Sequence, residues 1–134
     1  MLQRDYILAL LEDFVSTVVP CLRKAFLHDD LSSVHEVEQE LAGLLDLDAS
    51  CALALTPDSL VTMTRLSGIG DSLAGYAAYV LTALADVYDQ TSNSELAELR
   101  RAQGRAMAQA SGWDLSEVPE GFDEISNIQK SLTK

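Results

Sequence analysis

The sequence predicts an all-α protein that folds as a single domain of five to six helices. Apolar residues recur at three- and four-residue spacings along most of the chain, which is the pattern of amphipathic helices. A chain of 134 residues with 48% hydrophobic positions can bury one core without disulfides or a structural metal. We expect the helical domain to span residues 1–111, followed by a partly docked or flexible acidic tail over residues 112–134.

The segment from Gln3 to Leu27 predicts a long amphipathic helix. Its apolar residues form two adjacent lines, one of Ile7, Leu11, Phe14, Val18 and Leu22 and one of Leu10, Val15, Val19 and Phe26. Pro20 lies inside this pattern, so we expect a bend one turn earlier or a break. The apolar face is wider than one neighbouring helix covers, which predicts a homodimer built mainly on this helix.

Capping signals place the next two helices. Ser33, with Glu36 three residues later, forms a capping box. It predicts a helix whose inner face carries Val34, Val37, Leu41, Leu44 and Leu45. Residues 46–55 are expected to be a linker with one helical turn. Thr56 and Pro57 then predict the N-cap and first residue of a short helix containing Leu60, Val61, Met63 and Leu66.

The fourth predicted helix is long and follows a glycine-rich junction. Gly68 is expected to end the preceding helix, and Asp71 is expected to cap the next one. This helix continues to Tyr88, is rich in alanine and is apolar almost all round. Such a helix usually lies at the centre of a bundle, packed by neighbours on several sides.

The last predicted helix begins at a second capping box, formed by Ser92 and Glu95, and passes through Leu96, Leu99, Ala102, Ala106 and Met107. Gly104 inside it is unfavourable, and Gly112 is expected to end it. Beyond that point apolar residues are scattered among polar ones, with a turn at residues 119–121. We expect this tail to dock through Trp113, Leu115, Val118, Phe122, Ile125 and Ile128 and to fray at its end.

The glycine stretch LSGIGDSLAG, Leu66 to Gly75, resembles the hairpin of a helix-hairpin-helix DNA-binding module. Such hairpins present backbone amides to a phosphate and add several basic residues nearby. Here Arg65 is the one nearby cation, and no further basic residue follows until Arg100. The chain also has a formal net charge of -12. We therefore expect neither nucleic acid nor anionic membranes to bind, and we interpret the stretch as a helix-to-helix junction.

Cysteine usage and hydropathy predict a cytoplasmic protein. Cys21 and Cys51 lie in apolar surroundings without the paired spacing of a zinc site or a redox motif, so both are expected to be buried thiols. No secretory leader is recognisable, and no apolar run approaches the roughly 18 residues that span a bilayer.

The basic cluster of Arg100, Arg101 and Arg105 is the candidate binding site. Arg101 and Arg105 share a helix face at four-residue spacing and could hold an anionic ligand or a partner's carboxylates. The favoured alternative is that these arginines pair with the protein's own excess of Asp and Glu. Tyr76 and Tyr79 are candidate binding aromatics as well, with packing at the core and rim of the bundle as the commoner role.

Neither a metal site nor a catalytic group emerges from the sequence. His28 and His35 lie in an acidic segment, but two histidines seven residues apart match no established ligand spacing. No serine or cysteine has a base supplied by its sequence context. We expect no metal, no cofactor and no enzymatic activity.

Three segments resemble an uncharacterised group of short bacterial all-helical proteins, and the resemblance covers most of residues 3–110. They are Arg4-Asp5-Tyr6-Ile7, VEQELAGLLDLD and LTALADVYDQTSNSELAELRRA. The last segment is also similar to one tetratricopeptide-type helical hairpin. Leu84, Ala85, Tyr88 and Ala97 lie near its small and aromatic positions, whereas Arg101 stands where that repeat has a bulky aromatic. The resemblance implies tetratricopeptide-like packing in the second half and brings no activity with it.

These patterns together favour a protein–protein interaction or scaffold module with a helical-repeat-like surface. The alternative is a helical protein that binds a small ligand, or acts as an enzyme, through Arg100, Arg101 and Arg105. A deep pocket with converging polar groups would favour that alternative.

Overall fold

The computed structural model describes residues 2–68 and 70–132, and within them it contains seven helices and no strand. In order these are α1 (Leu2–His28), α2 (Leu31–Leu44), α3 (Ala49–Ala52), α4 (Pro57–Ser67), α5 (Asp71–Gln90), α6 (Ser94–Ser111) and α7 (Asp123–Leu132). α3 is a single turn of four residues, and the other six are longer. The all-α single domain predicted from the sequence is confirmed.

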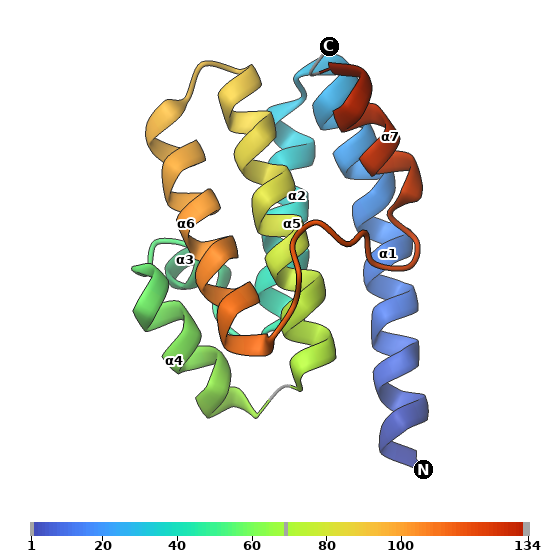
Figure 1. Cartoon of the computed structure of the whole chain (residues 1–134), viewed down its shortest axis with the longest axis vertical. Helices are drawn as coiled ribbons and strands as arrows, with labels where there is room; N and C mark the ends of the chain where they lie inside the picture. Colours follow the sequence, from blue (N-terminus) through green and yellow to red (C-terminus); the bar gives the residue numbers. More distant parts are fainter. Residues whose placement is uncertain (1, 69, 133–134) are drawn as a thin grey trace.

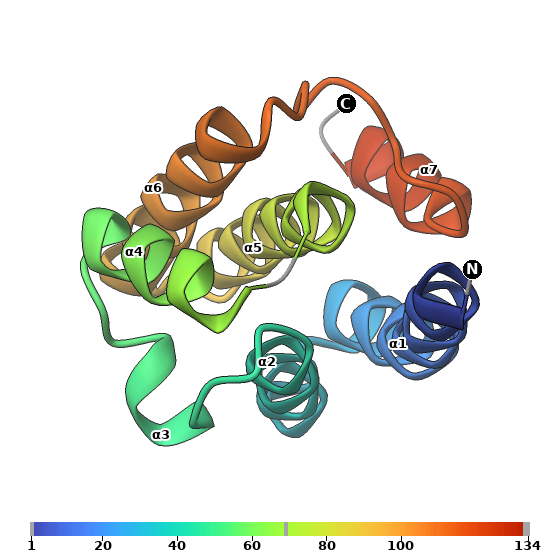
Figure 2. The ribbon, with the colours of Figure 1, turned by 90° about the horizontal axis from the view of Figure 1, so that it is seen from below.

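Two antiparallel helix pairs form the body of the bundle (Figure 1). α1 and α2 are joined by two residues, and α5 and α6 are joined by residues 91–93. α4 packs against α6, while α7 packs against α1. Figure 2 shows α5 between the α1–α2 pair and the α4–α6 side of the molecule. Tetratricopeptide-like packing of α5 and α6 stays a prediction, because many all-helical folds contain an antiparallel helix pair.

The start of α2 differs from the prediction. Asp30, rather than Ser33, is the N-cap, and its carboxylate accepts hydrogen bonds from the backbone N–H of Ser32 at 3.1 Å and of Ser33 at 3.4 Å. The Ser33 hydroxyl donates to the same carboxylate at 3.0 Å. The Ser32 hydroxyl, which donates to it at 2.7 Å, has the largest effect, and together these hydrogen bonds lower the pKa of Asp30, because they favour its charged form. An aspartate three residues earlier therefore outcompetes the predicted capping box.

Two further caps also lie beside the residues predicted for them. Gly70 is the N-cap of α5, so Asp71 is its first helical residue and makes no side-chain cap. Asn93 caps α6 by accepting from the N–H of Leu96, while Ser92 has a positive φ of 64° in the preceding turn. The cap therefore lies one residue before the predicted position in α5 and one residue after it in α6.

The predictions for α4 and for the ends of two helices are confirmed. Thr56 caps α4 through the N–H of Ser59, with Pro57 as the first helical residue. Gly68 and Gly112 end α4 and α6 in the left-handed conformation, with φ of 77° and 73°. Glycine adopts this conformation without the steric penalty of a Cβ. α1 continues through Pro20 without a break.

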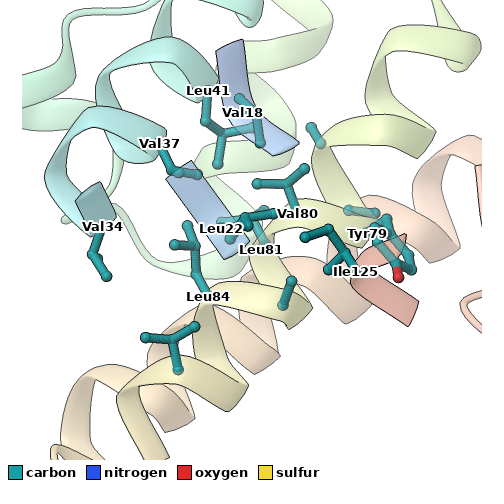
Figure 3. Close-up of a cluster of buried hydrophobic side chains, with 14 of the residues drawn as sticks. Val18, Leu22, Val34, Val37, Leu41, Tyr79, Val80, Leu81, Leu84 and Ile125 are labelled. Carbon is teal, nitrogen blue, oxygen red and sulfur yellow. The ribbon is translucent and has the colours of Figure 1, made fainter. Parts of the chain in front are cut away.

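The hydrophobic core lies around α5, as its all-round apolar sequence predicts. Thirteen of its twenty residues are buried. Figure 3 shows where the helices meet, with α1 contributing Val18 and Leu22, α2 contributing Val34, Val37 and Leu41, α5 contributing Tyr79, Val80, Leu81 and Leu84, and α7 contributing Ile125. Full burial of each large apolar side chain stabilises the fold by about 1.5–3 kcal/mol.

Part of the expected tail is a helix. Residues 123–132 form α7, whose Ile125 is fully buried together with the preceding Phe122. Arg23 of α1 donates from Nε and Nη2 to both carboxylate oxygens of Glu124, the Nη2 bond measuring 2.7 Å. This pairing lowers the pKa of Glu124. The fraying expected at the end of the chain concerns residues 133 and 134, which lie outside the described residues.

The two cysteines have different surroundings, and the prediction of two buried thiols is wrong for one of them. Cys21 is buried on α1, whereas Cys51 is exposed on α3. A single helical turn between two connecting segments has too little neighbouring structure to cover all its sides. Among the described helices, none has both the length and the apolar character that a bilayer crossing requires.

Candidate functional site

The first half of α1 contains a run of apolar residues from Tyr6 to Leu11, yet none of the residues from Tyr6 to Asp13 is buried. Burial begins at Phe14, which is 3% exposed, whereas Tyr6 and Leu8 are 65% and 49% exposed. In Figure 1 this half of α1 extends beyond α7, which lies along the other half. Large apolar side chains that gather on one exposed segment are typical of a contact surface.

A cleft of about 410 Å³ borders this segment on one side; we call it the α1–α2 cleft. α1 contributes Tyr6, Ile7 and Leu10, and α2 and α5 add Leu44 and Leu73. Its remaining lining comes from Gly43, Asp46, Ser67, Gly68 and Gly70. Three glycines and one carboxylate among apolar side chains give a smooth surface suited to an apolar occupant.

A second cleft of about 340 Å³, the α1–α5 cleft, borders the same segment. Its apolar lining comes from Leu8, Leu11, Val15 and Tyr76, and its charged lining comes from Glu12 and Glu120. The Tyr76 hydroxyl donates to the backbone carbonyl of Glu120 at 3.2 Å. Partial burial raises the pKa of Tyr76, so the hydroxyl stays protonated.

Tyr76 and Tyr79, the two predicted binding aromatics, both contact Phe122, with ring centroids 6.0 and 5.4 Å away. Tyr76 is half-buried and reaches the α1–α5 cleft, whereas Tyr79 is buried and its hydroxyl donates to the side chain of Gln129. Burial raises the pKa of Tyr79 to about 12. Tyr76 alone is thus placed where a partner can reach it.

The three predicted arginines point to different places. Arg100 is buried, and its Nε and Nη2 donate to Oε2 of Glu38 at 3.0 and 2.9 Å. Its Nη1 donates to the backbone carbonyl of Leu53 at 2.6 Å and to the side-chain oxygen of Gln103 at 3.1 Å. The Tyr88 hydroxyl also donates to Glu38, at 2.7 Å, and burial raises the pKa of Tyr88.

Arg101 pairs with Asp89 at 2.7 Å and with Asp86 at 3.1 Å on the surface of the α5–α6 pair. These hydrogen bonds raise the pKa of Arg101. Arg105 is exposed, and no hydrogen bond or ion pair joins it to the described residues. Pairing with the protein's own carboxylates, the favoured alternative, is confirmed for Arg100 and Arg101. A ligand at this cluster stays a prediction.

A groove of about 580 Å³ lies over the Glu38–Arg100 pair and is lined also by His35, Leu96 and Leu99. His35 Nδ1 is 3.5 Å from the second carboxylate oxygen of Glu38. The guanidinium of Arg100 is already held by Glu38 and by the Leu53 carbonyl. An anionic ligand would have to displace these partners, so the groove is a weaker candidate than the surface of α1.

The glycine stretch forms the junction between α4 and α5, with Ile69 outside the described residues. Gly75 lies where a Cβ would come within 2.8 Å of the Trp113 ring, so this glycine serves packing. Arg65 is exposed on α4 and lines a cavity of about 30 Å³ with Asp71. Within the described part of the chain, no three His, Cys, Asp or Glu side chains are grouped as a metal site would require.

Sequence reasoning missed the partners of Arg100. Glu38 and Gln103 are both drawn into the same polar cluster, and Gln103 is fully buried, donating to the carbonyls of Leu53 and Leu55. One signal existed: Arg100, Gln103 and Met107 recur at helical spacing on one face of α6. Of the apolar residues expected along this helix, Met107 is buried, whereas Leu96, Leu99, Ala102 and Ala106 are only half-buried.

No family model matches this chain, and no match was found among the curated proteins or the solved structures. The resemblance to short bacterial all-helical proteins therefore stays a prediction. The geometry of the described residues is what supports the functional proposal.

Proposed function

We propose that this protein is a protein–protein interaction module that binds its partner along the first half of α1. The observation that carries this proposal is the absence of any buried side chain between Tyr6 and Asp13, in a segment rich in Leu and Ile. Contact with a partner would remove Tyr6 and Leu8 from water, which favours a complex against the entropic cost of association.

The two clefts support the same proposal. They lie against one helix segment, so that a partner can insert side chains at both edges of α1. The homodimer predicted from the sequence uses this surface as well, and a second copy is one possible partner. The serine hydroxyls that line the clefts, Ser16 and Ser67, donate to backbone carbonyls of their own helices and not to a carboxylate, so binding is favoured over catalysis at this surface.

The proposal is tested by replacing Tyr6 and Leu8 with Ser. Both side chains are exposed, so the fold should be unaffected. The matched control replaces Leu27 and Leu132 with Ser; these are 53% and 49% exposed and lie outside both cleft linings. Each protein is immobilised and exposed to lysate of its source cells, and light scattering measures self-association.

We expect the wild type and the control to retain the same protein, or to form the same dimer, and the Y6S/L8S variant to lose it. If the wild type retains no specific protein and stays monomeric near 14.5 kDa, the proposal is wrong. Equal loss in the control would also contradict it, because nonspecific hydrophobic binding would then explain the retention.

A further inference from the structure

The α1–α2 cleft contains a glycine that the fold itself does not need. Gly43 lies in the last turn of α2; in a helix interior, glycine is less favourable than alanine by about 0.5–1 kcal/mol. No atom lies within 4 Å of the position that a Cβ would take, and the backbone there is not left-handed. Neither turn geometry nor internal packing therefore accounts for this glycine, whereas close approach of an occupant of the cleft does.

The neighbouring glycines extend this surface. Gly68 and Gly70 line the same cleft, and each likewise has open space where a Cβ would lie. Gly68 needs its positive φ, but Gly70 does not have one. With Leu44 and Leu73 between them, the lining combines apolar side chains and bare backbone, which is the surface that another helix packs against most closely.

Among the side chains that the structure describes, the charges beside the cleft are negative. Asp46 lines it, Glu40 is exposed one turn before Gly43 on α2, and Asp71 follows Gly70. No Lys or Arg occurs in the sequence between Lys24 and Arg65. Arg65 lines a separate small cavity together with Asp71. The field around the cleft therefore attracts cationic partners.

A second copy of this chain does not match that field. Each copy carries a formal net charge of -12, so two copies repel each other as they approach. A symmetric interface would also bring the Asp46 carboxylates of both copies near the same apolar surface. A partner with basic side chains around an apolar face gains attraction at the rim and burial at the centre.

We propose, on the basis of the function proposed above, that the α1–α2 cleft binds a basic amphipathic helix of a partner protein. Its apolar residues at helical spacing lie against Ile7, Leu10 and Leu44. Its backbone approaches Gly43, and its Lys or Arg side chains reach Asp46 and Glu40. This is the helix-in-groove mode of recognition, with charge selecting the partner.

The probe is a helical peptide of Leu and Lys, about 18 residues long, with Leu at helical spacing on one face. One control peptide keeps the Leu face and replaces Lys by Glu, and another has the same composition as the probe in scrambled order. Binding of the labelled peptides to the full chain is measured by fluorescence anisotropy. We expect the Leu/Lys peptide to bind at least about 10-fold more tightly than either control, with binding weakened by salt.

Three variants locate the binding site. Gly43→Leu fills the cleft at a position with free space, so it should keep the fold and weaken the probe at least about 10-fold. Asp46→Asn keeps a residue type that tolerates the positive φ of 58° found there, and it should weaken binding about 2- to 5-fold. Gln109→Leu adds the same side chain at an exposed site on α6 and should change nothing.

Equal binding of the Leu/Lys and Leu/Glu peptides would overturn the proposal, and so would equal binding of the scrambled peptide. Unchanged binding by the Gly43→Leu variant would overturn it too. A dimer that Gly43→Leu dissolves would make a second copy the occupant instead. In that case, or if the probe fails while Y6S/L8S still loses a lysate protein, the interaction function stands and this choice of partner is wrong.

Discussion

Glu38 of α2 and Arg100 of α6 form a buried ion pair across 62 residues of sequence, with Nη2 of Arg100 2.9 Å from Oε2 of Glu38. The side chains are 12% and 6% exposed. Arg100 also donates to the Leu53 carbonyl beside α3, so this one guanidinium links α2, the α3 segment and α6. Removing one partner of such a buried pair strongly destabilises the fold, because the other charge is left without its partner.

Replacing Arg100 with Ala should lower the free energy of unfolding by about 3–5 kcal/mol, because Glu38 is left as a buried charge without its partner. The double variant Glu38→Leu/Arg100→Met should recover most of this loss, since it removes both charges and keeps apolar volume. Urea unfolding of the wild type, the single variants Glu38→Leu and Arg100→Met, and the double variant measures the coupling. Purely additive losses would show that the ion pair is not what holds these helices.

Replacing Arg101 with Ala should lower stability by less than about 1 kcal/mol, because its pairs with Asp86 and Asp89 are partly exposed. Replacing Arg105 with Ala should leave stability unchanged. Thermal melting of each variant, with partner retention measured on the same protein, separates bracing from binding. Loss of retention in the Arg101→Ala/Arg105→Ala double variant at unchanged melting temperature would favour the arginine cluster as the functional contact.

Stability should fall as the pH rises above about 9. Burial and a 2.8 Å hydrogen bond from Sγ to Glu36 raise the pKa of Cys21 from 9.0 to about 11 in the folded chain. Between these values the folded state holds a proton that the unfolded state has released, so deprotonation favours unfolding. Urea unfolding at about pH 8 and about pH 10.5 measures the decline. The Cys21→Ala variant should show a shallower decline; an equal one would assign the effect to other groups, such as Tyr79.

Two glycines inside helices should respond to alanine in opposite directions. At Gly104 of α6 a Cβ would lie 2.7 Å from Cγ2 of Thr82 and 3.0 Å from the backbone oxygen of Ala78 on α5. Gly104→Ala should therefore destabilise by about 1–3 kcal/mol. Gly43→Ala meets no atom and should stabilise by about 0.5–1 kcal/mol. Chemical denaturation compares the two, and equal signs would contradict the packing described for α5 and α6.

Local rules predicted the larger part of the fold because they act within a few residues. Thr56 followed by Pro57, and Gly68 and Gly112 at helix ends, lie where capping chemistry places them. α5 is apolar on nearly all sides and lies at the centre of the bundle, as its sequence predicts. Three N-caps lie one to three residues from the predicted positions. Asp30 and Asn93 accept hydrogen bonds from backbone N–H groups at the start of α2 and α6, whereas Gly70, the N-cap of α5, makes no side-chain hydrogen bond.

The candidate site was less predictable because it depends on contacts between distant segments. The wide apolar face of α1 was visible in the sequence, but which part of it is covered depends on where α2, α5 and α7 pack, and α7 was expected to be tail. The inner face of α6 includes Arg100 and Gln103, and a polar residue faces inward only where distant acceptors exist to satisfy it. The acceptors here are Glu38 and the backbone carbonyls of Leu53 and Leu55. They are distant from α6 in the sequence, so the local pattern does not show that they contact this helix.

The docking of α7 against α1 has a consequence for the order in which the protein matures. Phe122 and Ile125 are fully buried, and Glu124 is paired with Arg23. During synthesis α1 leaves the ribosome long before these residues exist, so until then the side of its second half that faces α7 exposes apolar side chains. α2 and α5 pack against the second half of α1 as well, and α7 completes its covering. The first half of α1 stays exposed in the finished protein, as the whole helix is in the nascent chain before the later helices form.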